Sequence, residues 1–343
     1  MIFDELTFEQ CLAQGVGPTV FPKRLEDAID PEHNAGMKMV CLQNLQQQVK
    51  LQYTLTQAWT ALTKAGIRPV LMKGAGLAAL YPEPQMRTWG DIDLFVGIDQ
   101  YHPACAVMRE TFPDALKFDE ELDHYKHYNL IADGISIEIH RVSVGFQHPI
   151  DERRYAQMEH FGVEHAEPLT VNGLEVKVFE PTFNALFVML HSWEHMITQG
   201  ANVRQLYDVA LLLRRYHKQI DAQRLKKWLN QLHLMDVWKL YMYLLVQYLG
   251  VPQEETFFYD NSERLAARGE RLMKDLLAGK MVEPKPQEQA SRNRIIRKWH
   301  TMQGRLRNAR RIAKYSPAYA RHMNATTLLH GALRFFAKDR HWE

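Results

Sequence analysis

The stretch LMKGAGLAALYPEPQMRTWGDIDLFV, Leu71–Val96, decides the fold of this chain. Apolar runs bounded by Gly and Pro predict strands, and a Lys-Gly pair between such a run and a run of small residues predicts a turn into a helix. The stretch and the residues before it predict, in order, a buried strand, a turn, a short helix, a polar loop with several prolines and a second strand: Arg68–Met72, Lys73-Gly74, Ala75–Leu80, Tyr81–Gly90 and Asp91–Val96.

The flanking sequence predicts further helices and two hairpins. A long helix over 38–65 ends at Gly66, where a C-terminal cap is favoured, and its apolar period runs through Leu42, Leu45, Val49, Leu55, Trp59 and Leu62. Asp-Gly and Asn-Gly pairs between apolar runs predict tight hairpin turns. The remaining predicted elements are a helix, a hairpin, a second hairpin and four more helices: Tyr101–Thr111, Tyr128–Ile131 with Ile135–His140, the turn Asn172-Gly173, Pro181 to about Met196, Leu206–Tyr216, Arg224–Leu232 and Val237–Leu249.

The composition is that of an ordinary globular protein. The chain has 343 residues, of which 46% are hydrophobic and 24% charged, and this length favours two domains. Three scattered cysteines predict no disulfide framework, and the acidic start predicts no signal peptide. No apolar run is long enough for a membrane span. We therefore expect a cytoplasmic protein.

Charge is distributed unevenly along the chain. The net charge is only +2, yet Ser291–Glu343 holds thirteen Lys and Arg against two Asp and Glu. Such a basic block predicts contact with phosphates, nucleic acid or an acidic protein. A helical face that docks on the acidic body of the protein is the simpler interpretation, because apolar residues recur in the block at helical spacing: Ile295, Ile296, Trp299, Met302 and Leu306.

Two of the predicted strands carry acidic residues on the face opposite the core. Residues i and i+2 of a strand point the same way, so Asp91 and Asp93 project side by side, as do Glu138 and His140. Adjacent carboxylates repel each other, and a divalent cation removes that repulsion. Mg²⁺ prefers one or two carboxylates together with water and substrate phosphates. If the two strands are neighbours, Asp91, Asp93 and Glu138 converge on a metal site.

The turn at Lys73-Gly74 predicts a contact with phosphate. Glycine lets the backbone approach a ligand closely, and a helix N-terminus favours an anion. The cationic side chains of Lys73 and Arg87 are candidates to neutralise the oxygens of a triphosphate. Trp89 and Tyr81 are expected to pack in the protein rather than to stack on a base.

The stretch Leu71–Val96 resembles the signature of the uncharacterised nucleotidyltransferase family, within the DNA polymerase β-like superfamily. The shared features are a Lys-Gly turn, a Tyr-Pro pair, an Arg and then Gly-Asp-Ile-Asp-Leu. The later IEIHR, Ile137–Arg141, resembles the family's third-carboxylate strand, and LYDVALLLRR, Leu206–Arg215, resembles its helical half. The chain departs from the superfamily pattern in its Lys-Gly, where Gly-Ser is usual, and in the long spacing from Gly74 to Asp91.

The resemblance implies an α+β fold, in which a small mixed sheet of the nucleotidyltransferase type with flanking helices is joined to a helical second domain. It also implies transfer of a nucleoside monophosphate from a nucleoside triphosphate to an acceptor hydroxyl, on a small molecule, a protein or an RNA end. Asp91 and Asp93 would hold Mg²⁺ or Mn²⁺, and Glu138 would be the third ligand and orient the acceptor. The nucleotide would be contacted by Lys73, Gly74, Arg87, Gly90 and His140.

The expected boundaries give an N-terminal helical segment, the α/β core, a helical domain and the basic C-terminal segment: 1–65, 66–180, 181–290 and 291–343.

Other interpretations stay open. The sequence HSWEH contains the H-x-x-E-H pattern of zinc proteases in His191, Glu194 and His195, with both imidazoles on one helix face. A zinc hydrolase also needs a third ligand, which the sequence does not identify. The same histidines, with Arg204 and Asp208, could instead contact substrate across a cleft. A non-catalytic protein that binds nucleotide or RNA on this fold is a further alternative.

Overall fold

A computed structural model describes residues 1–118, 122, 124–146, 148–198, 200–280, 307 and 309–325. The apolar residues expected to form a helical face in the basic block, Ile295 to Leu306, lie outside the described residues. Within the described part of the chain, no helix is both long and apolar enough to cross a membrane.

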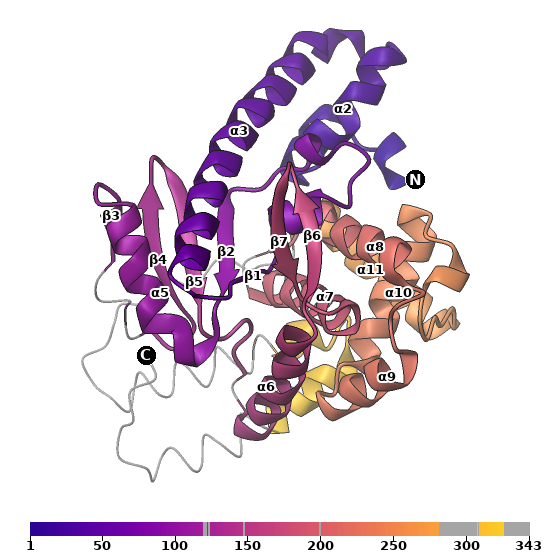
Figure 1. Cartoon of the computed structure of the whole chain (residues 1–343). Coiled ribbons are helices and arrows are strands. Elements are labelled where there is room, and N and C mark those ends of the chain that lie inside the picture. Colours follow the sequence, from indigo (N-terminus) through magenta and orange to yellow (C-terminus); the bar gives the residue numbers. More distant parts are fainter. Residues whose placement is uncertain are drawn as a thin grey trace, which may run out of the picture.

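A five-stranded mixed sheet forms one half of the structure (Figure 1). The second and third strands in spatial order run parallel, and the other neighbours run antiparallel. The spatial order is β1 (Val70–Leu71), β2 (Asp91–Phe95), β5 (Ile135–His140), β4 (His127–Ala132) and β3 (Leu116–Lys117). The two acid-bearing strands, whose adjacency the sequence left as a condition, are therefore neighbours.

Two helices cover one face of this sheet, α3 (Asn34–Lys64) and α5 (Gly97–Thr111), as Figure 1 shows. The apolar side chains that alternate along β2, β4 and β5 point into this layer and are buried: Ile92, Leu94, Tyr128, Leu130, Ile135, Ile137 and Ile139. The alternation leaves the acidic side chains on the opposite face.

Both predicted hairpin turns are present. Asp133 and Gly134 join β4 to β5 with φ of 49° and 78°, and Asn172 and Gly173 join β6 (Glu167–Val171) to β7 (Leu174–Val178) with φ of 48° and 83°. A two-residue turn with both φ values positive matches the twist of the flanking strands, and Asn, Asp and Gly adopt it most readily. The β6–β7 hairpin lies against β1 and closes the end of the sheet.

The second half is helical and has its own core. It contains α6 (Pro149–Glu164), α7 (Pro181–Thr198), α8 (Val203–Tyr216), α9 (Ala222–Gln231), α10 (Met235–Leu249) and α11 (Glu263–Leu277). The N-terminal helices α1 (Phe8–Ala13) and α2 (Gly17–Glu26) share this core, and so do Ile312, Tyr315 and Ala320. The described structure also contains the short elements η1 (Ile2–Asp4), η2 (Pro31–His33), η3 (Pro84–Met86), η5 (Gln253–Glu255) and α4 (Ala75–Ala78), and residues 309–312 and 317–325 are helical.

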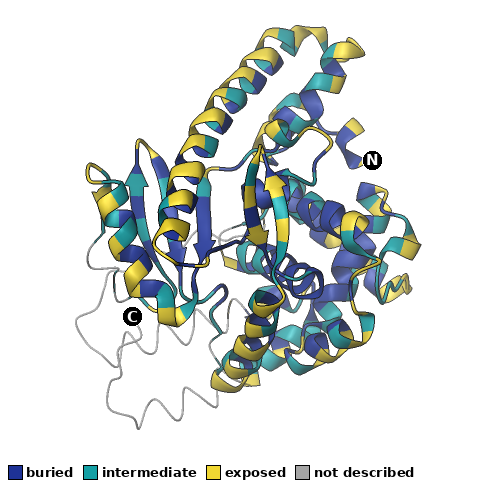
Figure 2. Cartoon of the chain, in the orientation of Figure 1, coloured by how far each residue is buried: buried dark blue, intermediate teal, exposed yellow. Residues whose placement is uncertain are grey.

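The prediction of the apolar face of the long helix was wrong in the N-terminal half of α3. Leu42 and Val49 are 51% and 71% exposed, and Figure 2 shows the outer side of α3 as exposed. Asn44 and Gln48 are buried instead. Asn44 Nδ2 donates to the Gln85 carbonyl at 2.7 Å, and Gln48 Nε2 donates to the Arg87 carbonyl at 3.2 Å. Amide side chains occupy this face because the loop packed on it presents backbone carbonyls that need donors.

Candidate active site

Three carboxylates meet on the open face of the sheet. Asp91 and Asp93 project from the same side of β2, and Glu138 lies directly across from Asp93 on the parallel strand β5. One ligand oxygen from each of the three lies within 4.8 Å of the other two. Asp93 is 1% exposed, and among the described residues its Oδ2 has no hydrogen-bond partner. A buried carboxylate oxygen without a partner is costly, and a cation is the kind of ligand that removes the cost.

Lys73 places an ammonium group among these acids. Its Nζ lies 3.0 Å from Asp93 Oδ1 and 3.8 Å from Asp91 Oδ2, and its side chain is 14% exposed. Burial would lower the pKa of Lys73, but the carboxylates of Asp93, Asp91 and Glu138 outweigh that effect and raise it. The lysine is therefore charged and partly neutralises the cluster. Its predicted contact with phosphate stays a prediction.

His140 links two of the acids. Its Nε2 lies 2.9 Å from Asp93 Oδ1 and 3.1 Å from Glu138 Oε2, and the residue is buried. Burial would lower the pKa of His140, but the hydrogen bonds to Asp93 and Glu138 raise it. Burial would likewise raise the pKa of Glu138, yet the same hydrogen bond to His140 brings it down to about 2. The imidazole thus holds both carboxylates in place, and Glu138 is ionised near neutral pH.

His127 belongs to the same group, although the sequence analysis did not select it. It stands opposite His140 across the β4–β5 hairpin, with ring centroids 4.9 Å apart. Its Nδ1 lies 3.9 Å from Glu138 Oε2. The signal was available in the sequence, because a two-residue turn at Asp133-Gly134 fixes which residues face each other along the hairpin.

A cleft of about 120 Å³ opens beside the acids, between the sheet half and the helical half. One wall comes from the predicted turn and loop, and the other comes from α7 and α8. The lining residues are Lys73, Gly74, Leu77, Arg87, Trp89, Gly90, Asp91, Phe187, Val188, His191, Ser192, His195, Arg204, Gln205 and Asp208. The cleft places cationic, amide and imidazole groups across from Asp91.

Arg87 forms a buried ion pair instead of an open contact. Its Nε and Nη2 donate to the two oxygens of Asp208 at 2.7 and 2.8 Å, and its Nη1 donates to the Gly74 carbonyl at 3.1 Å. Tyr81 also donates its hydroxyl to Asp208 Oδ1 at 2.8 Å. From the sequence, Arg87 was a candidate for contact with phosphate, and contact of Asp208 with substrate was one open alternative. In the structure the two side chains use each other, and they join the loop before β2 to α8.

Arg204 is the more available cation at the helical wall. It lies in the first turn of α8 and lines the cleft, and its Nη1 donates to the Thr88 carbonyl at 2.9 Å. Burial and the nearby Arg87 charge lower the pKa of Arg204 from its usual value, which is far above neutrality, so it keeps its charge. Trp89 and Gly90 line the same cleft.

The Lys73-Gly74 turn differs from the expected anion site. The helix that follows, α4, contains only four residues, and the Gly74 carbonyl is taken by Arg87. Gly74 has φ of 55° and ψ of −113°, which is a conformation for glycine. A Cβ there would lie 3.0 Å from Trp89 Cε3 and 3.3 Å from the Asp91 carbonyl. The glycine thus allows the turn to approach the start of β2.

The two histidines of the H-x-x-E-H pattern on α7 face the cleft, and in the described part of the chain they belong to no group that could hold a metal. The rings of His191 and His195 are 4.4 Å apart, and both residues line the cleft. Burial lowers the pKa of both imidazoles and raises that of Glu194, so the imidazoles are neutral near pH 7. Within the described residues, the groups that could hold a metal contain neither histidine. The zinc-hydrolase alternative therefore lacks its ligand set there.

The chain belongs to the uncharacterised nucleotidyltransferase family, whose model matches residues 7–250. The predicted family and α+β fold class are thereby confirmed, the latter also by the mixed sheet and its helices. A comparison with curated proteins finds no match. Among solved structures, the crystal structure of an antigenic nucleotidyltransferase-like protein from Paracoccidioides brasiliensis is 16% identical, covering 60% of this chain and 93% of that one with a TM-score of 0.36. A likeness of this size carries no argument.

Proposed function

We propose that this protein is a metal-dependent nucleotidyltransferase that moves a nucleoside monophosphate from a nucleoside triphosphate to an acceptor hydroxyl. The observation that carries the proposal is the group formed by Asp91, Asp93 and Glu138 at the edge of a cleft. The group fits Mg²⁺ or Mn²⁺, because its donors are carboxylate oxygens and one of them, Asp93 Oδ2, is buried and has no partner in the described part of the chain. Asp91 and Asp93 would hold the ion with Glu138, and the ion would polarise the α-phosphate and neutralise the charge that develops there.

The residues of this chain divide the remaining work. The acceptor oxygen attacks the α-phosphorus and its proton passes to Glu138 and on to solvent, while the bond between the α-phosphorus and the bridging oxygen breaks and pyrophosphate leaves. Glu138, ionised and 22% exposed, accepts a hydrogen bond from the acceptor hydroxyl and orients it. The hydrogen bonds of His140 Nε2 hold the carboxylates of Glu138 and Asp93 in position. Lys73 and Arg204 supply positive charge for the triphosphate, and Gly74 and Gly90 let it approach the backbone.

The site also has an arrangement that favours a non-catalytic alternative. Lys73 Nζ already forms an ion pair with Asp93, so part of the negative charge is satisfied without a metal. If that pair persists when nucleotide is bound, the protein would hold a triphosphate without transferring it.

Thermal unfolding with and without nucleotide tests the proposal. The purified protein is heated with each of ATP, GTP, CTP and UTP, in the presence and absence of Mg²⁺. A ligand at about 100 times its Kd stabilises the native state by about 2.7 kcal/mol, which raises the midpoint measurably. We expect a Mg²⁺-dependent rise with at least one triphosphate, and its loss in Asp91→Asn with Asp93→Asn.

The matched control is Asp99→Asn, on the exposed side of α5, which should leave the shift intact. Release of pyrophosphate in the presence of cell-derived acceptors would separate catalysis from the non-catalytic alternative. A parent protein with no Mg²⁺-dependent shift for any triphosphate, or a double variant that shifts like the parent, would contradict the proposed site.

A further inference from the structure

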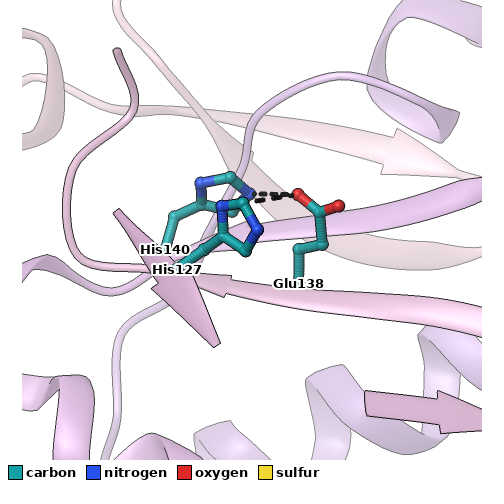
Figure 3. A group of neighbouring side chains, drawn as sticks. All are labelled: His127, Glu138 and His140. Atoms are coloured by element: carbon teal, nitrogen blue, oxygen red, sulfur yellow. Dashed lines mark hydrogen bonds and ion pairs between the residues drawn. The ribbon is translucent and has the colours of Figure 1, made fainter. Parts of the chain in front are cut away.

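A second group of metal-ligating side chains lies beside the three carboxylates. His127 on β4 and Glu138 and His140 on β5 each offer a ligand atom, and these atoms lie within 4.8 Å of one another. Figure 3 shows both imidazoles gathered at the Glu138 carboxylate. His140 Nε2 lies 3.1 Å and His127 Nδ1 3.9 Å from the same oxygen, Glu138 Oε2. Two imidazole nitrogens and one carboxylate thus surround a single point.

The hairpin places these three side chains with little freedom. His127 is paired directly with His140 across the two strands, and Glu138 stands two residues before His140 on the same face. The positions are fixed by the Asp133-Gly134 turn and by strands on both sides of β5. Ligands carried by paired strands are held more precisely than ligands carried by loops, so the group needs little rearrangement to bind an ion.

The donor set differs from that of the neighbouring carboxylates. His127 Nδ1 is buried and has no hydrogen-bond partner among the described residues, although it faces Glu138 Oε2. Imidazole suits zinc and other divalent transition metals, whereas Mg²⁺ prefers oxygen ligands throughout. Two histidines and one glutamate are also a known three-ligand set for zinc with a fourth position open.

We propose that His127, Glu138 and His140 form a second cation site, selective for a divalent transition metal of the zinc class. The site shares Glu138 with the carboxylate group of Asp91 and Asp93. A bound zinc ion would replace the two hydrogen bonds that His140 Nε2 now makes, to Asp93 and to Glu138. Because Glu138 belongs to both groups, occupancy of this site changes the ligand available to an ion on Asp91 and Asp93.

Zinc titration of a variant that lacks the neighbouring acids tests the site. The full chain carrying Asp91→Asn and Asp93→Asn is titrated calorimetrically with Zn²⁺ alone, and bound zinc is counted after gel filtration. We expect one zinc ion per chain. Adding His127→Ala should weaken zinc binding at least tenfold, since it removes one of three protein ligands.

Two further variants in the same background serve as controls. His160→Ala removes an imidazole that is 81% exposed on α6 and should leave the Kd unchanged. His191→Ala with His195→Ala removes the cleft pair of α7 and should also leave it unchanged. Circular dichroism of each variant without metal checks that the fold is retained.

Cobalt provides a second readout that a structural role of His127 would not affect. Co²⁺ bound in place of zinc gives visible absorption bands that depend on its ligands, and these bands should disappear with His127→Ala. The proposal is overturned if the double Asn variant binds no zinc, if His127→Ala binds it as tightly as its parent, or if loss follows the α7 pair instead. These results use no triphosphate, so they stand whether or not the nucleotidyltransferase proposal fails.

Discussion

Replacing Asp208 with Ala should destabilise the protein far more than breaking an ion pair at the surface. Asp208 and Arg87 each have only 4% of the side chain exposed, and their two hydrogen bonds of 2.7 and 2.8 Å are bidentate. Removing one partner of such a pair leaves a buried charge without compensation, at a cost of about 3–5 kcal/mol. The same substitution removes the acceptor of the Tyr81 hydroxyl. Because this hydrogen bond belongs to the same network, its free energy is not added to the cost of about 3–5 kcal/mol already given for the ion pair.

Urea unfolding followed by tryptophan fluorescence measures this cost as a fall in the unfolding midpoint. The matched control is Lys239→Met, which breaks a 3.1 Å pair with Asp260 whose side chains are 36% and 29% exposed. A pair in that setting contributes about 0–1 kcal/mol. The double variant Arg87→Met with Asp208→Leu should recover most of the loss, because well-packed apolar groups often replace a buried pair at little cost.

Two results would refute this reasoning. The charge would not be the cause if Asp208→Ala cost no more than Lys239→Met. Packing, and not the unpaired guanidinium, would be the cause if Arg87→Met with Asp208→Leu were as unstable as Asp208→Ala alone.

Two further predictions concern a buried acid and a strained turn. Burial raises the pKa of Glu159 to about 7, although Ser143 donates its N–H and hydroxyl to the carboxylate. In the unfolded chain this group ionises above its ordinary pKa of 4.5, whereas in the folded protein it ionises only near 7. The free energy of unfolding therefore falls by up to about 3 kcal/mol as the pH rises from 4.5 through 7. Glu159→Gln, which keeps the acceptor, should match the parent in urea midpoint at pH 4.5 and exceed it at pH 8; equal midpoints at both would contradict the assignment. Gly74→Ala should lower the free energy of unfolding by at least about 1 kcal/mol more than Gly66→Ala does. Both glycines have positive φ, but a Cβ at Gly74 would meet Trp89, whereas a Cβ at Gly66 would meet no described atom within 4 Å. Equal thermal midpoints for the two variants would show that the turn at Gly74 has room for a Cβ.

Local chemistry allowed most of the sheet to be predicted from the sequence. Asp-Gly and Asn-Gly turns define the hairpins, and strand alternation separates Ile135, Ile137 and Ile139 from Glu138. The juxtaposition of Asp91 and Asp93 follows from the same alternation. Their position beside Glu138 depends also on the parallel pairing of β2 with β5. The sequence did not predict this pairing, and the convergence of the three acids was expected only if the strands were neighbours.

Long-range contacts account for what the sequence did not predict. Arg87 meets Asp208, which is 121 residues away, and no local pattern distinguishes that partner from a phosphate. The buried amides of Asn44 and Gln48 depend in the same way on carbonyls from a loop some forty residues further along, at Gln85 and Arg87. A prediction from the spacing of apolar residues assigns Asn and Gln to the surface. It does so because the spacing does not show which backbone carbonyls elsewhere in the chain will need a hydrogen-bond donor. His127, in contrast, could have been predicted from the sequence. The two-residue turn at Asp133-Gly134 fixes the register of the hairpin and places His127 opposite His140.

The Arg87–Asp208 pair also explains how two separate cores can build one site. The sheet contributes to both cores, since Val70, Met72 and Phe95 pack with the helical half, and each half supplies one wall of the cleft. Arg87 lies four residues before Asp91, so an ion pair that anchors this loop to α8 also fixes where β2 begins relative to the helical wall. The buried charge pair, whose geometry is bidentate, therefore helps to set the distance between the carboxylates and the groups on α7 and α8, together with the packing of Phe95 on Phe179. Loss of Asp208 should consequently weaken nucleotide binding together with stability, although Asp208 itself is occupied by Arg87 and Tyr81.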